Sequence, residues 1–189
     1  MFHFAQAVWR NIQRCGLTEA YTNDIQFQNW SRLILALPHI PTYDVEDFWL
    51  EQVIGNMPAE AWPASQQLVD YVTNFWIDDA TATFHIPVWN HFATQGSRTT
   101  NHLEAWHKTL NDYHNTHSPN IFASIVALKK EQAKSEIKLA QLNHGAAPVA
   151  KRRKYVRLED RLRRLKVRFM RHEIDLVGYA TAISHLMGY

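Results

Sequence analysis

The sequence is poor in cysteine and has no long apolar stretch. Cys15 is its single cysteine, so the chain cannot close an internal disulfide or build a zinc site from several thiolates. No apolar run approaches the roughly 18 to 20 residues that span a bilayer, and we expect no membrane partner. Polar residues interrupt the apolar ones at the N-terminus, which argues against a secretory signal peptide. We therefore expect an intracellular protein.

The net charge is also small, but it is unevenly distributed. The 189 residues carry a formal net charge of +2. Residues 151–171 hold eleven Lys and Arg against two acids, a local net of +9, which leaves −7 for the rest of the chain. Because a polyanion responds to a local cluster of one sign, this segment is a candidate for DNA contact. The residues expected to contact phosphates are Lys151, Arg152, Arg153, Lys154, Arg157, Arg161, Arg164 and Arg168.

Two other interpretations of the basic segment stay open. It could be a solvated cationic helix, and the Lys-Arg-Arg-Lys run at 151–154 could be a nuclear-localisation signal, which would place a eukaryotic protein in the nucleus. No base-reading motif is visible, so the sequence does not support sequence-specific recognition.

Strand signals are scarce, and helical periods dominate. Apolar residues at helical spacing predict four helices before residue 77, the first ended by Gly16 and the second by Pro38. We expect Asn23 or Asp24 to cap the second, Thr42 the third, and Ser65 to open the fourth. Residues 77–97 lose this period and predict a loop that packs its aromatic residues on the helical bundle.

Further helices are expected from Thr99 or Thr100 to about Tyr113, and from Ser118-Pro119 to about residue 142. Residues 143–150 are the best linker candidate. Beyond them, an apolar stripe on a cationic helix is formed by Leu158, Leu162, Leu165 and Phe169, and a last helix packs through Ile174, Val177, Ala182, Ile183 and Leu186. We expect the seven Trp to lie in the core, His39 to be a satisfied turn residue, and Cys15 to be a small buried hydrophobe.

Glu104 and His107 are three residues apart and share one face of the predicted helix. Glu-x-x-His spacing lets one helix offer two metal ligands, although such a site needs further ligands from other helices. The spacing also occurs by chance, so a solvated Glu104 is the competing interpretation. In that case Leu103 and Trp106 pack the helix inward.

A wider pattern surrounds Glu104. Trp89-Asn90 followed by the Arg98–Asn111 segment resembles the signature of Mutator-like (MULE) DDE transposases. Similar matches are found in Phe2-His3-Phe4 with Gln6–Arg10, in Leu35–Leu37 with Pro41, and in Asp70-Tyr71 with Trp76-Ile77. The matches run in the expected order over most of the chain, and they cover the C-terminal part of such a transposase.

The resemblance implies a helical insertion within an RNase H-like core for residues 2 to about 76. It makes Glu104 the last acid of the catalytic triad and a ligand of Mg²⁺ or Mn²⁺ in a complete relative. Asn101, Trp106 and His107 belong to the same motif. His3 matches the histidine of the family's Cys-x-x-His motif. Thr100 and Ala105 depart from the usual Asn and Gly.

We therefore expect a mainly α chain with the catalytic sheet largely missing. Its predicted parts are an insertion-like bundle (1–77), a loop and helices carrying the final Glu (78–142), and a linker, basic segment and C-terminal helices (143–189). The expected function is that of a truncated or remnant MULE-type transposase, DNA-associated and inactive alone. The alternatives are a non-catalytic helical DNA-binding or protein-interaction domain, and an inert fragment whose exposed apolar stripes cause self-association.

Overall fold

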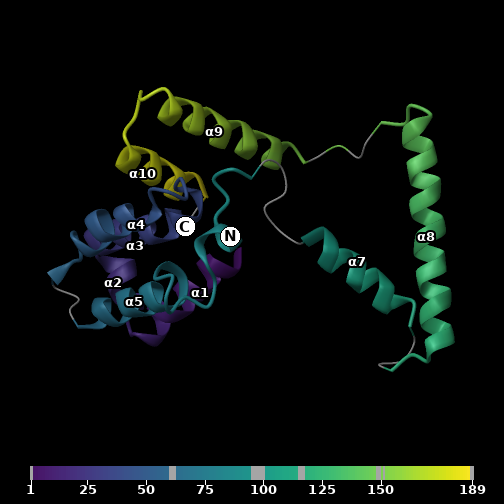
Figure 1. Cartoon of the computed structure of the whole chain (residues 1–189), viewed down its shortest axis with the longest axis horizontal. Coiled ribbons are helices and arrows are strands. Elements are labelled where there is room, and N and C mark those ends of the chain that lie inside the picture. The colour runs from purple at the N-terminus through teal and green to yellow at the C-terminus, as the bar shows by residue number, and fades with distance from the viewer. Residues whose placement is uncertain are drawn as a thin grey trace. The chain divides into compact units, whose positions relative to one another are not determined.

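The structure, a computed structural model, describes residues 2–59, 63–94, 101–114, 118–147, 150 and 152–187. Every regular element in these ranges is helical, which confirms the mainly α class (Figure 1). The contacts divide the chain into two units, Met1–Arg98 together with Val156–Tyr189, and Thr99–Tyr155. This grouping is discontinuous in sequence, unlike the three consecutive parts predicted. No helix in the described ranges is both long and apolar enough to cross a membrane.

The first unit begins with α1 (Phe2–Arg14), α2 (Thr18–Asn23) and α3 (Ile25–Ala36). Phe4, Val8 and Ile12 of α1 are buried, and their spacing of four residues places them on one side of the helix. Gly16 ends the α1 segment at φ +71°, and the amide of Leu17 donates to the carbonyl of Ile12 over 2.9 Å, the hydrogen bond of a Schellman C-cap.

Asp24 is the N-cap of α3, as predicted, because its carboxylate accepts a 2.7 Å hydrogen bond from the amide of Gln26. The turn η1 (Leu37–His39) follows, with His39 buried in it. The helix that we expected Thr42 to cap begins later than predicted. Its first part, α4 (Val45–Phe48), starts after Asp44 rather than at Thr42, and it continues into the π-helical η2 (Trp49–Ile54).

The fourth helix is likewise divided, into α5 (Ala64–Val72) and the π-helical η4 (Thr73–Ile77). It starts at Ala64, one residue before the predicted Ser65. Indole N–H groups tie these elements together. Trp30 donates to the carbonyl of Val53 over 2.8 Å, and Trp49 donates to the hydroxyl of Thr73 over 3.1 Å.

The predicted loop after residue 77 does pack aromatic residues on the bundle. The ring of Trp89 stacks on that of Phe4 at 5.0 Å, and Trp76 meets both rings edge-on. The loop also contains α6 (Ile86–Trp89), a single turn that was not predicted. The Asn90 amide donates to the carbonyl of Ile40 over 2.7 Å, which fixes the end of this turn on the bundle.

The same unit is completed by α9 (Arg153–Met170), from Val156 onward, and by α10 (Leu176–Met187). α10 packs on α3 and η1 through Tyr179, Ala180 and Ile183, which are all buried. Leu162 is the buried residue of α9, and the rings of Phe169 and Tyr179 stack at 4.8 Å. The predicted apolar stripe of α9 therefore faces the bundle. We call α9 and α10 together the α9–α10 hairpin, and it contributes to the core of the first unit.

The second unit contains α7 (Asn101–Asp112) and α8 (Ile121–Asn143). The N-cap of α8 is Asn120, whose side chain accepts a 2.8 Å hydrogen bond from the amide of Ala123, so the helix starts two residues after Ser118-Pro119. The Tyr113 hydroxyl donates to Glu131 over 2.6 Å, and Lys134 pairs with Glu131 at 3.3 Å. These contacts tie the end of the α7 segment to α8.

The competing interpretation of the Glu104 segment expected Leu103 and Trp106 of α7 to pack inward, and both side chains are exposed instead. Leu103 is 50% exposed and Trp106 is 37% exposed, although their spacing is that of a core-facing stripe. Within the second unit, α8 leaves these two side chains of α7 uncovered. Trp106 is also the exception to the expected burial of the tryptophans, since Trp30, Trp49, Trp76 and Trp89 are buried and Trp9 is half-buried. Trp62 lies outside the described residues.

Candidate nucleic-acid interface

α9 carries two parallel stripes with the same spacing. The apolar stripe is Leu158, Leu162, Leu165 and Phe169, and the arginine stripe is Arg157, Arg161, Arg164 and Arg168. Each arginine directly precedes an apolar residue, so the two stripes are offset by about 100° around the helix axis. All four arginines are exposed, while Leu162 is 6% exposed. Packing of the apolar stripe therefore holds the arginine stripe along the outer side of the hairpin.

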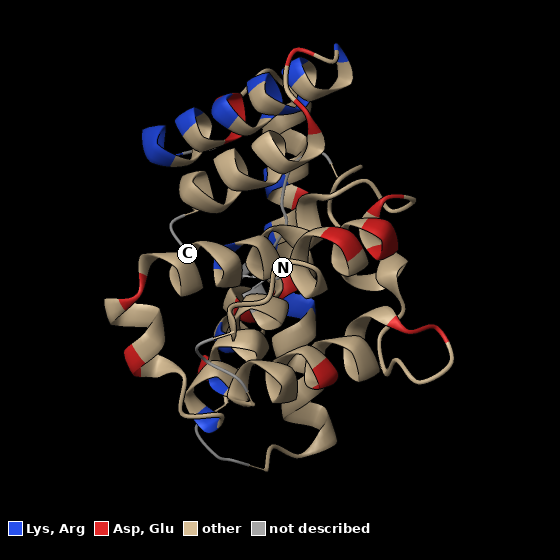
Figure 2. Ribbon diagram, turned by 90° about the vertical axis from the view of Figure 1, so that its left-hand side faces the viewer, with Lys and Arg blue, Asp and Glu red and all other residues tan. Residues whose placement is uncertain are grey.

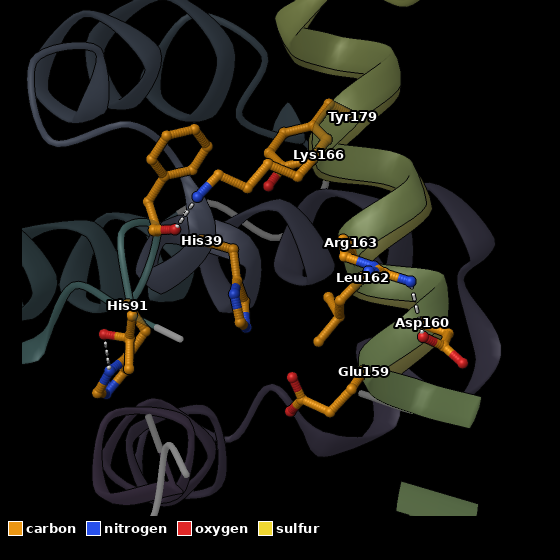
Figure 3. A pocket seen from close by; sticks show the side chains of 10 residues that line it. His39, His91, Glu159, Asp160, Leu162, Arg163, Lys166 and Tyr179 are labelled. Atoms are coloured by element: carbon orange, nitrogen blue, oxygen red, sulfur yellow. Dashed lines mark hydrogen bonds and ion pairs between the residues drawn. The ribbon is translucent and has the colours of Figure 1, made fainter. Parts of the chain in front are cut away.

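Arg163 and Lys166 lie on a different side of α9 from the arginine stripe. Arg163 contacts the carboxylate of Asp160 at 3.2 Å, and the ammonium group of Lys166 donates to the carbonyl of Phe92 over 2.7 Å (Figure 3). Lys166 also lies 4.3 Å from the centre of the Phe92 ring. These two cations have partners within the fold, and their positive charge is locally compensated or used in packing.

The arginine stripe has far fewer partners. Arg168 lies 3.5 Å from Glu173, beyond the C-terminal end of α9. Arg157, Arg161 and Arg164 have no ion-pair partner in the part of the chain that the structure describes. Figure 2 shows the resulting concentration of Lys and Arg on α9, at the top of the view. The sequence predicted a basic segment, and within α9 the arginines without an ion-pair partner among the described residues lie on one side of the helix.

The geometry of the stripe suits a phosphate backbone. Arg157 and Arg168 are separated by eleven residues, or about 16 Å along the helix axis. Guanidinium groups keep their charge at physiological pH and can donate two parallel hydrogen bonds to a phosphate. A row of such groups binds phosphates irrespective of base sequence.

The other predicted basic residues are at the start of α9. Arg152, Arg153 and Lys154 are exposed there, and Lys151 lies outside the described residues. Their exposure is compatible with phosphate contact, and equally with the localisation signal that the same run resembles.

Three residues of the predicted catalytic motif, Glu104, Trp106 and His107, are exposed on α7. The His107 ring lies 5.1 Å from that of Trp106. The side chain of Asn101 lies outside the described residues. His3 is an exposed residue of α1 and belongs to the other unit. Among the described residues, no three His, Cys, Asp or Glu side chains form a group that could hold a metal ion.

A cavity of about 390 Å³ beside α9 was not predicted from the sequence. Its lining includes His39 of η1, His91 of the following loop, and Glu159 of α9. Figure 3 shows the side chains of His39 and Glu159 projecting into the same space from their two elements. His39 is 3% exposed, in agreement with its expected role as a satisfied turn residue. The sequence signal that could have drawn attention here is the mixed charge of Glu159, Asp160, Arg163 and Lys166.

Cys15 is half-buried, and it packs against the core beside Leu17. Burial raises the pKa of its thiol, and the neighbouring Arg14 lowers it. The net rise in pKa keeps the thiol protonated near neutral pH, which disfavours a reactive role.

Comparison with known protein families, curated proteins and solved structures found no match for this chain.

Proposed function

We propose that this chain is a helical, DNA-associated protein that binds the phosphate backbone through the arginine stripe of α9. The observation that carries this proposal is that three exposed arginines at helical spacing, Arg157, Arg161 and Arg164, have no acidic partner within the described residues. The resemblance of the Arg98–Asn111 segment to MULE transposases supports DNA as the polyanion. In that interpretation, the chain is a truncated or remnant transposase.

Binding of this kind has a defined physical signature. Each neutralised phosphate releases condensed counterions, and it contributes roughly −0.9 to the slope of log affinity against log salt on duplex DNA. Four arginines would therefore give a slope of about −3.6. Because the contacts go to the backbone, duplexes of different sequence should bind with similar affinity.

Catalysis by the chain alone is not part of the proposal. Two-metal strand cleavage needs several carboxylates converging on cations that are about 3.5–4 Å apart. Glu104 supplies one, and Asp112, the next acid of α7, lies about 12 Å farther along the helix axis. The described residues of α7 therefore do not fit a two-metal site with Mg²⁺ or Mn²⁺. In a complete relative, Glu104 would be one ligand among carboxylates from other elements.

The test is a titration of the purified chain with duplex DNA at several salt concentrations. Saturable binding that weakens linearly with log salt supports the proposal. Negligible affinity at low salt, with the chain folded by circular dichroism, would exclude it.

A second candidate function is protein interaction through α8. Several large apolar side chains of this helix are more than half exposed, and they include Ile121, Phe122, Ile137 and Leu139. An exposed apolar surface on a helix is a common feature of protein-interaction sites. This surface belongs to the second unit, so it can be tested independently of the arginine stripe.

A further inference from the structure

The arginine stripe forms one edge of a groove between α9 and α10. The groove has a volume of about 470 Å³, and its lining is Arg161, Arg164, Leu165, Arg168, Ala182, His185 and Leu186. Leu165, Ala182 and Leu186 are only partly buried, so the groove presents apolar surface between cationic side chains. All of its lining residues belong to the first unit.

A DNA backbone would contact only the cationic side chains of this groove. Phosphates pair with the arginines, but they leave the apolar surface of Leu165 and Leu186 in contact with water. A helical segment that carries both carboxylates and apolar side chains can pair with the arginines and also cover the apolar surface, as in other helix-in-groove complexes. The groove therefore fits an acidic amphipathic helix.

The chain itself offers a surface with these properties, at the segment from Tyr43 through α4 to η2. Tyr43 is 74% exposed and Leu50 is 58% exposed. Tyr43 lies in the turn before α4, and Leu50 lies in the π-helical η2. The exposed acids beside them are Glu46, Asp47 and Glu51. We call Tyr43, Glu46, Asp47, Leu50 and Glu51 the acidic face.

The acidic face is held rigidly and is uncompensated. On the opposite side of the same segment, Val45, Phe48 and Trp49 are buried in the core. Glu46, Asp47 and Glu51 have no cationic partner in the described part of the chain. The pKa of the adjacent Asp44 is raised by burial and by the charge of Asp47, which indicates how closely the acids lie.

We propose that the α9–α10 groove of one copy binds the acidic face of a second copy. Charge complementarity supports this occupant, since Arg161 and Arg164 of the groove and the acids of the face have no ion-pair partner among the described residues. No residue of the acidic face lines the groove, so the contact has to form between molecules. The two surfaces differ, which makes the interface heterologous, with each copy able to bind one neighbour at either end.

This self-association does not depend on DNA binding, but the two share residues. Arg161, Arg164 and Arg168 cannot contact phosphates and the carboxylates of a second copy at once. A duplex that occupies the stripe therefore releases the second copy.

Sedimentation of the full chain over a range of concentrations, at about 0.1 M and about 1 M salt, tests the proposal. The screening length falls from about 10 Å to about 3 Å between these conditions. We expect concentration-dependent association at the lower salt and its loss at the higher. A monomer at every concentration would overturn the proposal. Association that persists or grows at 1 M salt would overturn it too, because it indicates apolar contact through α8.

Charge reversal gives the sharper arm of the test. The variants R161E/R164E and E46R/D47R should each lose association by roughly tenfold or more, whereas an equimolar mixture of the two should recover it. The control E19Q/D112N neutralises exposed acids elsewhere and should associate as the wild type does. Normal association of either charge-reversed protein would show that the interface is assigned wrongly. So would a mixture that fails to recover association while both proteins melt as the wild type does.

Discussion

The guanidinium of Arg163 lies 3.2 Å from the carboxylate of Asp160, one turn earlier on α9. Both side chains are substantially exposed, so the pair adds little to stability. Its importance lies in the distribution of charge, because it neutralises Arg163 on the side of the helix that faces the cavity of Figure 3. Arg161 and Arg164, on the other side, have no such acid among the residues that the structure describes. The proposed DNA interface rests on this difference between neighbouring arginines.

Replacement of Leu162 by alanine should loosen the hairpin that presents the stripe. Leu162 is the most buried residue of α9, and removal of a buried leucine side chain costs about 2–5 kcal/mol. Thermal or denaturant unfolding should show this loss of stability. The control is Val167→Ala, since Val167 is 42% exposed on the same helix and should change stability little. Equal effects of the two changes would mean that α9 is not anchored through Leu162.

The aromatic cluster around Phe4 should be a main source of stability for the first unit. Phe4 is 1% exposed, and its ring contacts those of both Trp76 and Trp89. Phe4→Ala should lower the free energy of unfolding by about 3–5 kcal/mol. Phe84→Ala is the comparison, because Phe84 stacks on Trp76 but is 46% exposed. A smaller loss for Phe4→Ala than for Phe84→Ala would contradict the described packing.

Acidification should weaken the contact between α7 and α8. The hydrogen bond from Tyr113, followed by the interactions with Lys134, holds the pKa of Glu131 below its ordinary value. A carboxyl group whose pKa is lower in the folded state stabilises that state above its unfolded pKa. The stabilisation is lost as pH falls through the folded value. Amide hydrogen exchange in α7 should therefore accelerate on acidification, beyond the intrinsic change in exchange rate.

The variant Tyr113→Phe tests the cause of this pH dependence. It removes the largest contribution to the lowered pKa of Glu131, so protection of α7 should be lower near neutral pH and should change less on acidification. Glu136→Gln is the control, because Glu136 accepts a hydrogen bond from Gln132 within α8. An unchanged pH profile in Tyr113→Phe would show that the hydroxyl does not control Glu131.

The purified chain should not cleave DNA in the presence of Mg²⁺ or Mn²⁺. The expectation follows from the single carboxylate that α7 offers at Glu104. Incubation of supercoiled plasmid with the chain and either metal measures this directly. Cleavage that disappears in Glu104→Gln would contradict the proposal and would make Glu104 part of a working site.

Helical periodicity predicted the buried face of α3, because its apolar residues find partners within the same unit. For α10 it was right about Ile183, but Ala182 and Leu186 are only partly buried, and the buried Tyr179 and Ala180 were not predicted. The same reasoning failed for Leu103 and Trp106 of α7. Periodicity identifies an apolar face, but it does not show that enough surface exists to cover it. The π-helical segments η2 and η4 also escaped prediction, since a template of 3.6 residues per turn does not describe them.

The candidate site was predictable in part. The equal spacing of the arginine and apolar stripes can be recognised in the sequence, and it places the arginines beside the packed face of α9. The pairing of Arg163 with Asp160 is local and could also have been anticipated. By contrast, the hydrogen bond of Lys166 to Phe92 joins residues 74 positions apart. The cavity that includes His39, His91 and Glu159 depends on such long-range contacts, which no local pattern encodes.

The most direct test of the proposed function compares salt dependence between matched arginine variants. Binding of a duplex should be measured over a series of salt concentrations for the wild type, R161Q/R164Q and R163Q. We predict that the slope of log affinity against log salt becomes shallower by about 1.8 in R161Q/R164Q and stays near the wild-type value in R163Q. Equal slopes for all three proteins, or a larger change in R163Q than in R161Q/R164Q, would contradict the assignment of the arginine stripe of α9 as the DNA-binding surface.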